Sequence, residues 1–135
     1  MAYVFDKTLE TGNQLIDTQH RELINRLNQL IDACATGKGR ASIDGFVKNV
    51  ADYTAKHFAD EERLQQDSKY PDYVNHKRYH DAFKTTVATV AREISAQGPT
   101  ISMVGKVNND IAGWLIKHIK NEDSKVAKHV KTVNS

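Results

Sequence analysis

Apolar residues recur at intervals of three and four positions along most of the chain, and no stretch alternates as a strand would. This spacing matches the turn of an α-helix, so it predicts four amphipathic helices. Their expected ranges are about 18–36, 41–66, 73–96 and 100–120, with breaks at Gly37-Lys38-Gly39, Tyr70-Pro71 and Gly98-Pro99. Because short connections make successive helices antiparallel, the pattern predicts an all-α, up-down-up-down antiparallel four-helix bundle. Residues before about Ile16 are expected to form an N-terminal arm along it.

Histidines interrupt the apolar stripes at one end of this predicted bundle. Five of the six histidines fall on core-facing positions, and Glu61 follows one of them by a single turn. One histidine on an apolar face is usually a satisfied core residue. Several ionisable groups buried together are costly unless they are paired or ligated, so the pattern favours a metal site in the core. The five histidines are His20, His57, His76, His80 and His118. His129 lies off the pattern and is expected to be an exposed helix or tail residue.

The types of donor narrow the choice of metal without fixing it. Neither CxxC nor HExxH occurs, so a structural zinc site and a zinc-protease site are both weakly supported. Imidazoles combined with carboxylates suit iron, with copper, zinc and manganese as weaker alternatives.

Composition limits the other classes of function. A length of 135 residues suits one domain with a proper hydrophobic core. Charged residues make up 27% of the sequence, and the net charge of +2 is too small to indicate nucleic-acid binding. The single cysteine, Cys34, cannot form an internal disulfide, which favours a reducing compartment. The N-terminus lacks the features of a secretory signal, and no apolar run approaches membrane-spanning length. A cytoplasmic protein without membrane insertion is therefore expected.

The ordered motifs resemble those of the hemerythrins, and of the bacterial ones in particular. They are His20, His57-Phe-Ala-Asp-Glu61, His76-Lys-Arg-Tyr-His80 and His118-x4-Asp123, and the match covers roughly Gly12 to Asp123. The resemblance implies one hemerythrin-like domain over residues 1–135 and a cofactor of two iron ions bridged by an oxo or hydroxo group. Gln65 departs from the family pattern, because many relatives carry a methionine there.

The resemblance also implies which residues hold the irons. His76, His80 and His118 would bind one iron, His20 and His57 the other, and Glu61 and Asp123 would bridge both. With the shared oxygen these groups supply about eleven of the roughly twelve bonds of two octahedral ions, leaving one position open on the iron with two histidines. On an ideal helix Glu122, four residues after His118, fits better than Asp123, five residues after it. The family pattern favours Asp123.

An open position on such a centre implies reversible dioxygen binding for transport, storage or delivery rather than catalysis. Two carboxylates support high-valent iron less well than four, which disfavours cleavage of the O–O bond. Four apolar residues would pack the core in any case and are expected to line a dry O2 pocket: Leu23, Phe58, Trp114 and Ile119. Two alternatives remain open, namely O2 or redox sensing, and iron or peroxide handling with oxidase or peroxidase activity.

Overall fold

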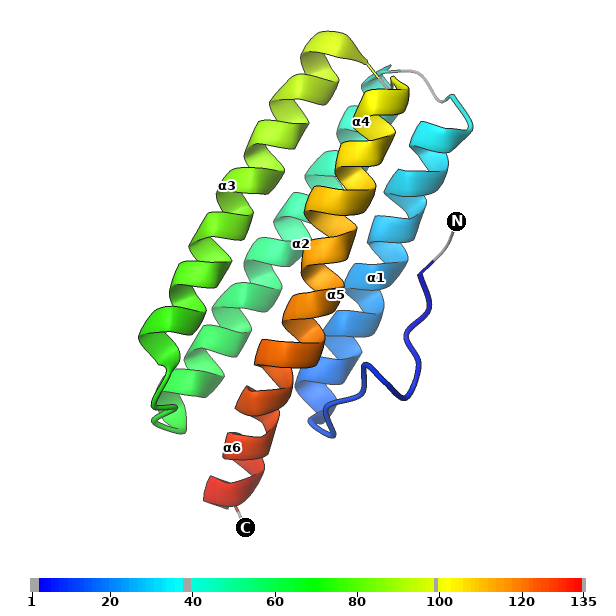
Figure 1. Ribbon diagram of the computed structural model, residues 1–135. Coiled ribbons are helices and arrows are strands. Elements are labelled where there is room, and N and C mark those ends of the chain that lie inside the picture. Colours follow the sequence, from blue (N-terminus) through cyan, green and yellow to red (C-terminus); the bar gives the residue numbers. More distant parts are fainter. Residues whose placement is uncertain (1–2, 38–39, 99, 135) are drawn as a thin grey trace.

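The computed structural model describes residues 3–37, 40–98 and 100–134, and these form four long helical rods side by side (Figure 1). The first three rods are α1 (Gln14–Ala35), α2 (Arg40–Asp67) and α3 (Tyr73–Gln97). The fourth is continuous and comprises α4 (Ile101–Lys106), η1 (Val107–Gly113), α5 (Trp114–His118), η2 (Ile119–Asp123) and α6 (Ser124–Asn134), where η denotes π-helix. No strand occurs among the described residues. The predicted all-α four-helix bundle is confirmed.

The fourth rod does not end near residue 120, as the apolar pattern suggested, but continues to Asn134. Its last part has an apolar face of its own, because Val126, Ala127 and Val130 are buried against Ile16 and Tyr70. The first helix likewise starts earlier than predicted, at Gln14, where the Asn13 side chain accepts a hydrogen bond from the Ile16 backbone N–H at 3.0 Å.

Two apolar clusters fill the bundle. The larger one occupies the end where α2 begins and α3 ends, and includes Leu27, Ile43, Ile94 and Val107. The smaller one lies at the opposite end, around Ile16, Tyr70 and Val126. A layer of buried polar side chains separates the two, and this layer contains the predicted metal ligands.

The segment before α1 packs along the bundle, as Figure 1 shows. The Asn28 side chain accepts from the Tyr3 backbone N–H at 2.8 Å and donates to the Tyr3 carbonyl at 2.7 Å. The Arg21 guanidinium lies 4.7 Å from the centre of the Phe5 ring. These contacts hold the predicted arm against α1. In the described part of the chain, no helix is long and apolar enough to cross a membrane.

Candidate metal centre

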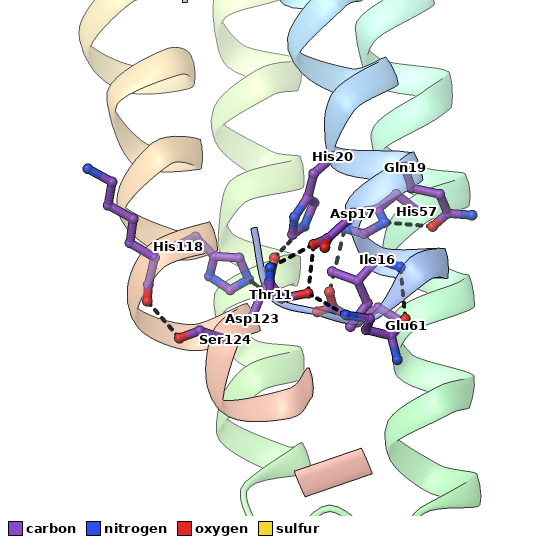
Figure 2. Close-up of polar contacts among 12 residues, drawn as sticks. Thr11, Ile16, Asp17, Gln19, His20, His57, Glu61, His118, Asp123 and Ser124 are labelled. Atoms are coloured by element: carbon purple, nitrogen blue, oxygen red, sulfur yellow. Dashed lines mark hydrogen bonds and ion pairs between the residues drawn. The ribbon is translucent and has the colours of Figure 1, made fainter. Parts of the chain in front are cut away.

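All seven predicted ligands meet inside the bundle, contributed by all four rods. They form two groups, and within each group the potential donor atoms lie within 4.8 Å of one another. One group contains Glu61, His76, His80, His118 and Asp123, and the other contains His20, His57, Glu61 and Asp123. Both groups therefore share the same two carboxylates. Figure 2 shows His20, His57, His118 and the two carboxylates directed towards the space between the helices.

The two carboxylates lie between the histidines of both groups. Asp123 places Oδ2 2.7 Å from His20 Nε2 and Oδ1 3.0 Å from His118 Nε2. Glu61 places Oε1 2.6 Å from His76 Nε2 and Oε2 3.5 Å from His57 Nε2. Each carboxylate thus has one oxygen towards each group, which is the arrangement a bridging ligand requires.

Two of the rings are oriented through their other nitrogen. His57 Nδ1 lies 2.7 Å from the Gln19 side-chain oxygen, and His80 Nδ1 lies 2.9 Å from Glu62 Oε2. Such partners fix the tautomer and turn Nε2 towards a metal. Sequence reasoning did not assign either role. The only signals were that Gln19 directly precedes His20 and that Glu62 directly follows Glu61.

A π-helical turn explains how Asp123 reaches the centre. The segment η2 begins directly after His118 and ends at Asp123. In a π-helix the backbone hydrogen bond joins residues five apart, so residues i and i+5 replace i and i+4 as neighbours on one face. Asp123 is buried beside His118, whereas Glu122 is partly exposed. The ideal-helix argument for Glu122 fails because the helix is wider at this point.

Burial and the nearby carboxylates shift the pKa values of the histidines in opposite directions. Burial lowers the pKa of His57 to about 3, with a smaller contribution from the neighbouring His20, and burial lowers the pKa of His80 to about 4. Burial also acts to lower the pKa of His76, but the carboxylates of Asp123 and Glu61, 3.1 Å and 2.6 Å from its Nε2, outweigh burial and raise the pKa to about 9. His57 and His80 are therefore neutral at pH 7, the form in which imidazole binds metals.

The chemistry of the layer fits a group of metal ions. Nε2 of His57 and Oε2 of Glu61 are buried, and neither has a hydrogen-bond partner among the described residues. Both carboxylate oxygens of Asp123 are also buried and have no hydrogen-bond partner among the described residues, although histidine nitrogens lie around them. Buried polar atoms without hydrogen bonds are rare and costly. Coordination to cations would satisfy them.

The apolar residues expected to line a pocket lie around the centre in two different settings. Leu23, Phe58 and Ile119 are completely buried, and the Phe58 ring stacks on His80 with centroids 3.7 Å apart. Trp114 is only half-buried and stacks on His118 with centroids 4.5 Å apart. It borders a surface hollow as well as the centre.

His129 is not the exposed residue that its position outside the pattern suggested. Its Nε2 lies 2.7 Å from the Ser68 carbonyl oxygen, and its ring contacts Tyr70. This contact fastens α6 to the connection between α2 and α3.

The sequence model of a protein family, the hemerythrin HHE cation binding domain, matches residues 11–130 of this chain. The chain is 36% identical to a bacteriohemerythrin of Stenotrophomonas maltophilia over 128 residues, which cover 95% of this chain and 81% of the relative. It is 34% identical to a bacteriohemerythrin of Pseudomonas aeruginosa, covering 90% and 76%, and 29% identical to the myohemerythrin of Sipunculus nudus, covering 91% and 89%.

The fold and the buried donors thus define a helical-bundle protein with a histidine- and carboxylate-rich cation site. The chain belongs to the hemerythrin family.

Proposed function

We propose that this chain binds dioxygen reversibly at a non-haem di-iron centre and serves to carry, store or deliver it, without catalysing its reduction. The observation that carries the proposal is the pair of donor groups that share Glu61 and Asp123. A donor set of this kind suits two adjacent ions rather than one. Five imidazoles and only two carboxylates give a centre with little anionic charge, which favours binding over cleavage of the O–O bond.

His76, His80 and His118 would hold one iron, and His20 and His57 the other, with Glu61 and Asp123 shared between them. The iron pair would supply the electrons that a bound dioxygen molecule accepts and later returns. Gln19 and Glu62 would keep the His57 and His80 rings turned towards the ions. Leu23, Phe58 and Ile119 would exclude water from the ligand, because their side chains are completely buried beside the histidines.

An optical titration tests this function. The protein is purified from iron-replete cells, its iron content is measured, and the reduced form is exposed to air and then to an oxygen-free atmosphere. We expect two irons per chain, a nearly colourless reduced form, a coloured form in air, and return of the first spectrum when dioxygen is removed. Mainly zinc, or one metal per chain, would contradict the di-iron centre. Continuous dioxygen consumption with a reductant, at rates typical of enzymes (roughly 1–10³ per second), would contradict the carrier function.

A further inference from the structure

A surface hollow of about 230 Å³ lies directly against the candidate centre. It is lined by Tyr79, Trp114, Lys117, His118, Asn121 and Glu122, which come from α3 and the fourth rod. His118 is 4% exposed, whereas the exposure of the other six candidate ligands is 0% or 1%. Among the seven candidate ligands, His118 is thus the most exposed to solvent.

An aromatic stack connects this hollow to the interior. The Trp114 ring lies nearly parallel to the His118 ring, at an angle of 13° and a centroid distance of 4.5 Å. On its other side Trp114 stacks on Phe83 at 11° and 4.1 Å. The π-helical segments η1 and η2 flank α5, the short helix that begins with Trp114 and ends with His118. Such segments are frequent at functional sites. The arrangement places the stacked Trp114 ring in contact with both the hollow and a proposed iron ligand.

We propose that a small planar aromatic reductant, a hydroquinone or a reduced flavin ring, binds in this hollow and passes electrons through Trp114 and His118 to the oxidised centre. The inference rests on the proposed function, because a ferrous centre that has lost electrons to dioxygen no longer binds it and must be reduced again. The donor loses two electrons and two protons and leaves as the quinone or the oxidised flavin. Each of the two ferric ions gains one electron, and the protons pass to solvent at the open side of the hollow.

The lining fits such a donor better than it fits an inorganic ion or a protein. Tyr79, which is 43% exposed, and Trp114 offer ring surfaces on which a planar molecule can stack. The Asn121 amide and the Lys117 ammonium can bond to ring oxygens or nitrogens. Lys117 contributes one positive charge to the lining and Glu122 one negative charge, so the hollow does not select a strongly charged partner. Its volume of about 230 Å³ suits one planar ring system of up to three fused rings. Its six lining residues are far fewer than the roughly 20–30 residues that each side of a typical protein interface contributes.

Binding can be measured without iron chemistry, because Trp114 is the single tryptophan of the sequence. Zinc-loaded protein, which cannot accept electrons, is titrated with riboflavin, an oxidised flavin without a phosphate group, and, separately, with a soluble benzoquinone. We expect saturable quenching of Trp114 fluorescence by at least one of the two, which also identifies the class of donor. Tyr79→Ser should weaken that binding by about tenfold, the order expected for the loss of one aromatic contact. The matched control is Tyr53→Ser, because Tyr53 packs over Arg26 instead and should leave binding unchanged.

Reduction kinetics of the diferric protein supply the second test. The rate with the reduced donor should saturate as its concentration rises, and Tyr79→Ser should raise the half-saturating concentration. Reduction by dithionite, an inorganic donor that needs no aromatic contact, should be the same in both proteins. Non-saturable quenching with equal rates in wild type and Tyr79→Ser would overturn the proposal, as would reduction by a protein donor alone. If the protein holds no iron pair but still binds the probe saturably, the proposed function fails and the hollow remains a ligand site.

Discussion

At the scale of single residues, two neighbouring acids differ in whether they could serve as a metal ligand. Asp123 is buried among His20, His76 and His118. Glu122 faces outward and lies 3.8 Å from the Lys125 ammonium. The π-helical turn between His118 and Ser124 produces this difference.

Asp123→Asn is therefore expected to lower the iron content below two per chain, because an amide is a much weaker bridging ligand than a carboxylate. Glu122→Gln should retain both irons. Elemental analysis of the two variants, purified side by side from the same medium, measures the effect. Retention of iron by Asp123→Asn together with loss by Glu122→Gln would restore the ideal-helix assignment.

Gln65 is a buried polar residue that makes one long hydrogen bond to a candidate metal ligand. Its side chain is 0% exposed, its amide donates a long 3.4 Å hydrogen bond to Glu61 Oε1, and its own oxygen has no hydrogen-bond partner among the described residues. Gln65→Met keeps the volume and removes the unsatisfied atom. It should stabilise the metal-free protein by about 1 kcal/mol, measured by urea unfolding. A clear loss of stability would mean that the hydrogen bond to Glu61 is stronger than its length indicates.

At the scale of elements, three of the four helical rods could be predicted closely from apolar periodicity, because α1, α2 and α3 keep a regular α-helical step. The fourth could not. The π-helical turn places Asp123, five residues after His118, on the same face as His118. A search for apolar residues at α-helical spacing therefore fails to follow the buried face as far as Val126. The roles of Gln19 and Glu62 depend on contacts between helices, to His57 and His80 respectively, and local sequence carries little information about them.

The Asp17 carboxylate, in the first turn of α1, holds the segment that precedes this helix. Asp17 accepts hydrogen bonds from the Thr11 N–H at 2.9 Å, the Thr11 hydroxyl at 2.7 Å and the Gly12 N–H at 3.1 Å (Figure 2). Asp17→Ala should destabilise the protein by about 1–3 kcal/mol, because it leaves these donors without their charged acceptor. The urea midpoint measures the change. Asp6→Ala is the control: Asp6 accepts two similar bonds from Thr8 in an exposed part of the arm, and its loss should cost less than about 0.5 kcal/mol.

At the scale of the whole molecule, the layer of ionisable groups divides the core into two apolar clusters. Without metal, the bundle must bury five histidines and two carboxylates with incomplete hydrogen bonding. Metal ions would connect all four rods across this layer, so metal binding and folding are linked.

The stability of the metal-free protein should therefore be greatest near pH 6.5 and decline on both sides. Below the ordinary histidine pKa of 6.5, His57 and His80 bind protons in the unfolded chain. In the folded protein they remain neutral until the pH falls to about 3 and 4, respectively, so acid favours unfolding. Above 6.5, the unfolded chain has released the proton that folded His76 keeps up to about pH 9, so its contribution disappears as the pH rises. Urea midpoints at about pH 4.5, 6.5 and 9 measure the profile. His76→Gln should abolish the alkaline decline and keep the acid one, and a metal-free protein with a flat profile would contradict the assignment of these shifts.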